Sequence, residues 1–219
     1  EQASEEQALQ TKNEDGVVEN TDKMFASVGV GDKEYKLLAK VSDFTKDGWK
    51  LEALRNENAT LVPGGKLEKD AFLTNKDGRK IGVIIRNLSD KNQKVSDCIV
   101  TKLSFSKEMF DGQITLPGSL GFDSTEKELK AAGFKKDADG IYTYTSKKIK
   151  DDTIKAAMAD GESVSEITLE RAVDESSTST GNAAANTSVS TAAGSATTTA
   201  SDSSSAEQNS ATADTTLTN

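Results

Sequence analysis

The chain has 219 residues, no histidine, one cysteine and a formal net charge of −9, from 27 Lys and Arg against 36 Asp and Glu. Without histidine, Ser-His-Asp and Cys-His nucleophile activation and the common zinc sites are impossible. One cysteine excludes an internal disulfide, and no apolar run approaches the ~20 residues of a transmembrane helix.

The negative charge lies at the two ends of the chain. Residues 1–22 hold seven acids against Lys12, and residues 174–219 hold five acids, 11 Ser and 11 Thr with no base. Neither segment can bury enough apolar surface to offset its ordering entropy. We therefore predict a disordered acidic stalk over 1–22 and a disordered Ser/Thr/Ala tail over 174–219.

The remaining body, 23–173, carries a balance of +2 and no basic block. This argues against nucleic acid, which needs several phosphate-neutralising cations on one surface. The same balance disfavours a basic membrane-surface helix. A Ser/Thr/Ala tail is typical of stalks outside the cell and equally of a plain flexible linker.

The first half of the body is predicted to be rich in β-strands, over residues 23–118. An extended run at 34–40 leads into a short helix at 42–47, which Gly48 ends. Further on, the turn at 75–78 joins residues 71–73 to an alternating apolar run at 81–85, which reads as a hairpin.

The only cysteine lies in a strand-like run at 95–100, and a second period-two run follows at 99–105. A free cysteine is among the most buried residue types, so Cys98 is predicted to be a buried, inert thiol.

The second half, residues 119–173, contains the clearest helix. Thr125 and Glu128 have the spacing of a capping box, and Gly133 is the natural end of the helix that follows. An extended run at 113–116 precedes it.

The segment 153–158 is ambiguous, because its Lys, Ala and Met residues favour a helix by propensity. We predict a strand from the parallel with the first half and from the turn after it. Ile167 and Leu169 alternate with polar residues in a closing strand with one buried face.

The two halves share a faint duplication. Gly48-Trp49-Lys50 follows the first helix and Gly133-Phe134-Lys135 the second, and the run at 95–99 resembles that at 164–167. We therefore predict an α+β fold of antiparallel sheets with two short helices, as a tandem repeat of a strand-helix-strands unit.

The second half also resembles small α+β bacterial envelope lipoproteins. The pattern is Gly121-x-x-Ser124-x-x-x-Glu128-Leu129, Gly133, Tyr142-x-Tyr144, then Gly161-x-x-Val164-x-x-Ile167-x-Leu169. It is similar to the fold of the small outer-membrane-assembly lipoproteins and, in tandem, to that of the β-lactamase inhibitor protein. The resemblance implies a lipoprotein of the Gram-positive type, anchored through a cysteine before Glu1.

Few residues point to chemistry. The segment 135–146 has Asp137, Asp139 and Gly140 at EF-hand spacing, but Lys135 and Ser146 stand where carboxylates are needed, so a hairpin turn is preferred to a calcium site. We expect no metal and no cofactor.

The candidate binding residues are aromatic. Tyr142 and Tyr144 share a face of one strand, and Trp49 is the only tryptophan. Such rings anchor interfaces, and they also fill small cores. Core packing is favoured for Trp49, and both alternatives stay open for the tyrosine pair.

From these observations we expect a non-enzymatic, secreted or cell-surface binding module for a protein, peptide or wall component, and a monomer. The alternatives are an assembly component of an envelope complex and, less favoured, a hydrolase using carboxylates or a Ser-Lys pair.

Overall fold

The computed structural model describes residues 17–54, 56, 58–159 and 162–173, which all belong to one compact unit. The predicted disorder of 1–16 and 174–219 lies outside the described residues. In chain order the elements are η1 (Lys23–Phe25), β1 (Ser27–Val30), β2 (Lys33–Lys36), α1 (Val41–Lys46), β3 (Lys50–Leu51), β4 (Thr60–Leu61), β5 (Lys66–Leu67), β6 (Phe72–Thr74), β7 (Lys80–Arg86), β8 (Gln93–Lys94), η2 (Val95–Asp97), β9 (Ile99–Ser106), β10 (Ile114–Thr115), α2 (Glu126–Ala131), β11 (Lys135–Lys136), β12 (Tyr142–Thr145), β13 (Thr153–Ala159) and β14 (Ser163–Glu170). The predicted α+β class, with antiparallel sheets and two short helices, is confirmed.

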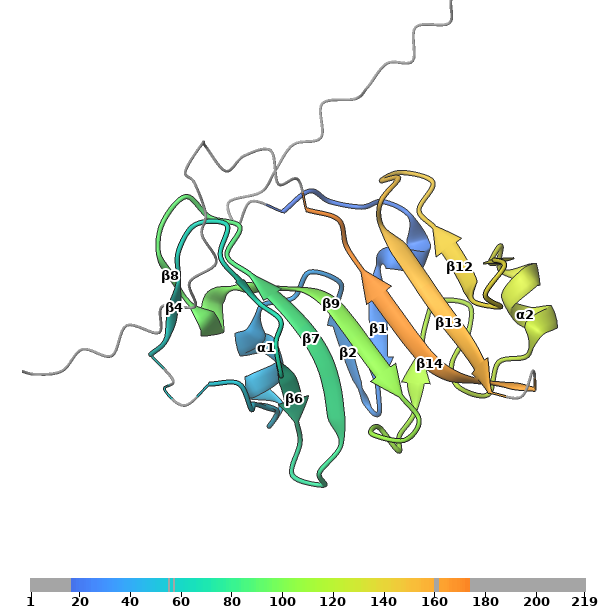
Figure 1. Ribbon diagram of the computed structural model, residues 1–219, viewed down its shortest axis with the longest axis horizontal. Helices are drawn as coiled ribbons and strands as arrows, with labels where there is room; N and C mark the ends of the chain where they lie inside the picture. Colours follow the sequence, from blue (N-terminus) through green and yellow to red (C-terminus); the bar gives the residue numbers. More distant parts are fainter. Residues whose placement is uncertain (1–16, 55, 57, 160–161, 174–219) are drawn as a thin grey trace, which may run out of the picture. The chain divides into compact units, whose positions relative to one another are not determined.

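The largest sheet has nine strands, all paired antiparallel. Its order is β11-β12-β13-β14-β9-β7-β6-β3, with β5 also paired to β7. The last long strand of the first half, β9, therefore lies beside the last strand of the second half, β14 (Figure 1). A three-stranded sheet, β10-β1-β2, and a two-stranded pair, β4-β8, complete the fold.

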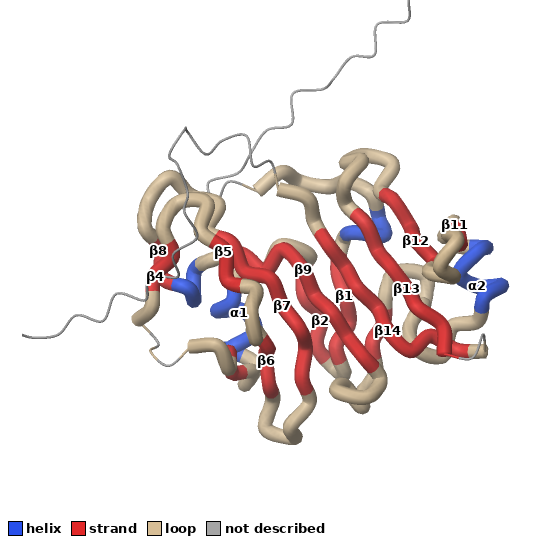
Figure 2. The backbone as a smooth tube through the Cα atoms, in the orientation of Figure 1, coloured by secondary structure: helices blue, strands red, loops and turns tan. Residues whose placement is uncertain are grey.

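The hydrophobic core lies on one face of the nine-stranded sheet. In β7 the buried residues Ile81, Val83 and Ile85 alternate with half-buried ones, as the period-two pattern predicts. β1, β2 and α1 lie behind this sheet in Figure 2, and their apolar residues join the same core. No described helix or strand lies in front of β7, β9, β14 and β13 in that view.

Both predicted helices form, and their ends explain why. Thr125 accepts the N–H of Glu128 at 3.3 Å, and the Glu128 carboxylate accepts the N–H of Thr125 at 2.8 Å, which completes the capping box. In α1, Asp43 accepts the N–H of Lys40 at 3.1 Å in the same way. Each helix contributes a buried apolar residue to the core.

The predicted hairpin between β6 and β7 is confirmed, because the Asn75 side chain accepts the N–H groups of Asp77 and Arg79, both at 3.0 Å. The ambiguous segment is a strand, β13, in which Ile154 and Ala156 are buried. Burial of alternate residues between two neighbouring strands outweighs the helix propensity of this segment.

Two predicted boundaries were wrong. Val95–Asp97 forms the 3-10 helix η2, so the strand begins only at Ile99 and the run at 95–99 is not the counterpart of 164–167. Residues 17–22, assigned to the disordered stalk, are packed against the body: Asn20 is 8 % exposed, with its side chain bonded to distant residues. Burial of the polar Asn20 side chain is made possible by these hydrogen bonds, whose partners lie far along the chain and are not indicated by the neighbouring sequence.

Candidate binding surfaces

The three aromatic residues singled out from the sequence all lie in the core. Tyr142 is 0 %, Tyr144 6 % and Trp49 7 % exposed. Trp49 stacks on Phe110 with ring centroids 6.2 Å apart, far along the sheet from the tyrosine pair. All three rings therefore pack in the core, as the sequence favoured for Trp49 and left open for the tyrosine pair, and their faces are not offered to a partner.

Tyr144 has one polar contact that fixes it. Its hydroxyl donates to the Asp22 carboxylate at 3.1 Å, and the N–H of Lys147 donates to the same carboxylate at 3.0 Å. Burial opposes ionisation of Asp22, but these donors and the N–H of Met24 outweigh it and hold its pKa below the ordinary value. Burial, with the Asp22 charge, raises the pKa of Tyr144.

A buried polar cluster ties the first described residues to the last. Asp152 and Arg171 form a buried ion pair, and the Asn20 amide donates to Asp152 at 2.6 Å. Burial raises the pKa of Asp152 and lowers that of Arg171, while the charge of each partner opposes the shift. Nothing in the sequence indicates this cluster, because Asn20 lies 132 positions before Asp152.

The same cluster brings the first and the last described residues of the chain close together. The Arg171 guanidinium donates to the carbonyl of Val18 at 2.8 Å, and the N–H of Ala172 donates to Asp152 at 2.7 Å. Residue 17 and residue 173 therefore leave the body at the same end (Figure 1).

The face of the nine-stranded sheet opposite the core is named here the open face. A row of small residues crosses the middle of this face. Gly82 lies opposite Ser104, and Ser104 lies opposite Thr168. Thr168 continues the row to the exposed Lys155. All of these positions are half-buried or exposed, in contrast to their buried neighbours along each strand.

Charged pairs border this row. Lys102 and Glu170 lie opposite one another through β9 and β14, with Nζ and Oε2 3.3 Å apart. On the other side Lys80 bonds Glu52 at 3.0 Å and lies over the Phe72 ring, 5.7 Å from its centroid. The open face thus has small residues along its centre, and charged side chains and the Phe72 ring at its border. This border is called the charged rim.

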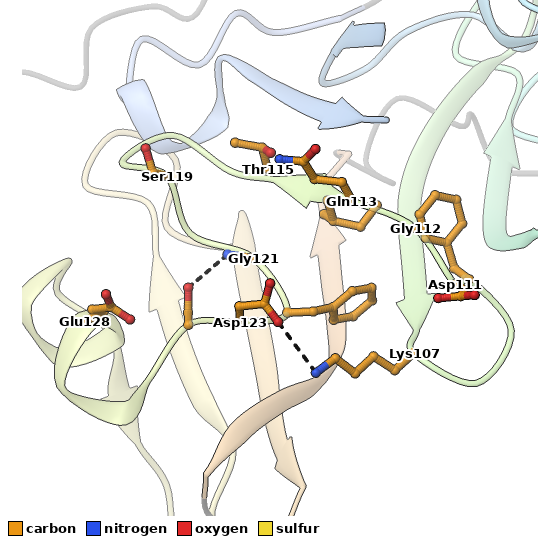
Figure 3. Close-up of a pocket in the computed structure, with 13 residues that line it drawn as sticks. Lys107, Asp111, Gly112, Gln113, Thr115, Ser119, Gly121, Asp123 and Glu128 are labelled. Carbon is orange, nitrogen blue, oxygen red and sulfur yellow. Dashed lines mark hydrogen bonds and ion pairs between the residues drawn. The ribbon is translucent and has the colours of Figure 1, made fainter. Parts of the chain in front are cut away.

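A pocket of about 830 Å³ lies between the loop after β9 and the loop before α2 (Figure 3). Lys107 and Asp123 face each other across it at 4.0 Å. Gly121 donates its N–H to the Ser124 hydroxyl at 2.9 Å, and its backbone lies against the carbonyl of Ile114, which leaves no room for a side chain there. The pocket is wide and polar, so it can hold a hydrated polar group.

The thiol and the acidic turn that the sequence raised as possible chemical sites have structural roles. Cys98 is 0 % exposed, burial raises its pKa to about 12, and its Sγ lies 3.3 Å from the carbonyl of Lys94, which confirms the buried thiol. The Asp137 carboxylate accepts the N–H groups of Asp139 and Ile141, so the hairpin turn is confirmed there. Within the described ranges, no three metal-ligating side chains gather, and no helix is long and apolar enough to cross a membrane.

Comparison of the chain with protein-family models, with curated proteins and with solved structures finds no match. The resemblance to envelope lipoproteins therefore stays a prediction.

Proposed function

We propose that this protein is a non-enzymatic binding module that engages a protein, a peptide or a cell-wall component through the open face of its nine-stranded sheet. One observation carries the proposal: the largest sheet has its core on one face only, while the other face presents a continuous surface built from four long strands. An antiparallel sheet can keep one face in water, and such a face is broad and rigid.

The side chains of the open face suit a macromolecular partner better than a small molecule. Small residues along the central row allow a partner's backbone or side chains to approach closely. The charged rim would fix the orientation of that partner on the sheet. A small molecule needs a concave site that buries most of its surface. A large partner instead gains affinity from a few well-packed contacts near the centre of a wide surface.

The tandem repeat predicted from the sequence is part of this proposal, and the helix ends support it. Gly48 and Gly133 follow the two helices with φ of +91° and +98°. In each case the next residue, Trp49 or Phe134, donates its N–H back into the helix, at 3.2 and 3.0 Å. A left-handed glycine ends many helices, so the support comes from the aromatic residue that follows it in both copies.

The strands give a second line of support. Ile84 and Ile85 of β7 pair with Lys102 and Val100, so Thr101 is an extra residue in β9. Ala157 and Met158 of β13 pair with Glu166 and Val164, so Ser165 is an extra residue in β14. Counted from each end of the sheet along β3-β6-β7-β9 and β11-β12-β13-β14, both bulges fall in the fourth strand and face the third. Bulges are retained as features of a fold. A duplication would make the open face two similar halves that meet at the Ser104–Thr168 pair.

We also propose that the protein lies outside the cell. The acidic and Ser/Thr-rich flanks are joined to the body close to the contact between Val18 and Arg171. A module held by a flank near that contact, for example through a lipid anchor, would leave its open face free. This fits a cell-surface lipoprotein.

Photo-crosslinking in the cells that produce the protein tests the proposal. A benzoylphenylalanine placed at Ser104, in the centre of the open face, is expected to give one discrete covalent product, identifiable by mass spectrometry. The control places the same group at Lys127, an exposed residue of α2 away from this face. Equal products from both positions, or none from Ser104, would contradict the proposal.

A blocking variant separates a specific contact from chance proximity. Thr168→Arg adds bulk beside Ser104 on the open face, where no buried neighbour is disturbed. We expect it to abolish the product from Ser104 while thermal stability is retained.

A further inference from the structure

The three-stranded sheet has one unpaired edge, the outer side of β2. β2 comes last in the order β10-β1-β2 and is joined to β1 by a tight turn at Gly31, whose φ is +62°. The outer side of β10 is covered by its own loop, because Leu116 bonds the carbonyl of Leu120 and Gly121 lies against Ile114.

The direction of the main-chain groups along this hairpin follows from one hydrogen bond. Gly31 donates its N–H to the carbonyl of Gln113, in the approach to β10. Main-chain groups alternate in direction along a strand. Val28 and Val30 of β1 therefore direct theirs to the other side, toward β2.

The β2 residues opposite these two valines are Tyr35 and Lys33. The residues between and after them, Glu34 and Lys36, must direct their N–H and C=O groups outward. No hydrogen bond of the described residues uses these outward groups, and both side chains are exposed. β2 thus offers two donors and two acceptors along a free edge.

A hollow of about 810 Å³ lies beside this edge. It is lined by Glu34, Tyr35 and Lys36 on the β2 side, and by Val17, the loop at 38–40 and α1 on the others. The ring of Tyr35 is stacked on Phe44 of α1 with centroids 4.2 Å apart, which holds β2 straight against the core.

We infer that the protein self-associates by antiparallel pairing of β2 with the β2 of a second copy, about a twofold axis at Tyr35. In this register Glu34 lies opposite the partner's Lys36, and Lys36 lies opposite the partner's Glu34. These are the residues with outward main-chain groups, so each pair makes two backbone hydrogen bonds as well as one ion pair.

The occupant follows from charge complementarity. A strand antiparallel to β2 is matched best by an acid followed two residues later by a base, and Glu34-Tyr35-Lys36 itself has that order. The flanks of this chain do not have it: residues 1–16 contain one base, Lys12, with Gln10 two positions before it, and residues 174–219 contain none. A second copy therefore fits the edge better than a folded-back flank.

This association goes beyond the proposed function and replaces the monomer expected from the sequence. The edge belongs to the smaller sheet, so pairing leaves the open face of each copy free. A dimer presents two open faces, which raises avidity for a partner with repeated sites. The contact is short, so the dimer forms at high local concentration.

Sedimentation of the full chain over roughly 1 μM to 1 mM tests the inference. We expect a reversible monomer–dimer equilibrium. Lys36→Glu or Glu34→Lys alone replaces both ion pairs by like-charge pairs and is expected to weaken the dimer about tenfold or more. The double variant Glu34→Lys/Lys36→Glu keeps complementary pairs and should dimerise like the wild type.

Mixing the two single variants gives the sharpest control. An equimolar mixture of Lys36→Glu and Glu34→Lys places two acids opposite two bases, so a heterodimer should form where neither variant alone dimerises. A wild type that stays monomeric throughout this range, or single variants that dimerise as the wild type does, would overturn the inference.

Discussion

Replacing both Tyr142 and Tyr144 by Ala is expected to unfold the protein. Both rings lie in the core, at 0 % and 6 % exposure, and Tyr144 packs against Phe25 and Phe134 with centroids 6.1 and 5.5 Å apart. Loss of a buried aromatic ring costs about 3–5 kcal/mol. Two such losses approach the whole stability of a domain, about 5–15 kcal/mol.

Thermal unfolding monitored by circular dichroism measures this effect. Tyr144→Phe is the matched control, because it keeps the ring and removes only the hydrogen bond to Asp22, for a cost of about 1 kcal/mol. A double Ala variant that melts cooperatively near the wild-type temperature would mean that these rings do not support the core.

The second large effect is expected at the buried ion pair. Arg171→Ala leaves the Asp152 carboxylate buried without its cation, and breaking such a pair costs about 3–5 kcal/mol. The variant also loses the hydrogen bond to Val18, so residues 17–22 should become accessible to proteases.

Lys102→Ala provides the comparison, because it breaks a pair with Glu170 that is partly exposed, at 31 % and 44 % of the two side chains. Exposed pairs contribute at most about 1 kcal/mol. Urea unfolding of the two variants should therefore give clearly different midpoints. Equal midpoints would show that the cluster around Asp152 does not hold the chain ends.

The sequence predicted the local structure well where a short-range signal determines it. The capping box at Thr125 and Glu128, the turn at Asn75 and the alternation in β7 all depend on residues within a few positions of one another. The strand β13 was predicted from its context, against the propensity of its residues.

The candidate site could not be predicted in the same way. Alternation shows that Tyr142 and Tyr144 share a face, but it does not show which face of the strand is covered. That depends on β1, β2 and the two helices packing on one side of the sheet. The buried cluster joining Asn20, Asp152 and Arg171 is also formed by contacts distant in sequence.

The central claim is that one face of the nine-stranded sheet, which no described element covers, binds a partner. Thiol labelling tests it directly, since the only native cysteine, Cys98, is fully buried. Ser104→Cys in the isolated, folded protein should react readily with a maleimide, more slowly than the exposed Lys127→Cys because Ser104 is half-buried. In intact producing cells it should be protected while Lys127→Cys stays reactive. A Ser104→Cys thiol as unreactive as Cys98 in the isolated protein, or equally reactive in both settings, would contradict the claim.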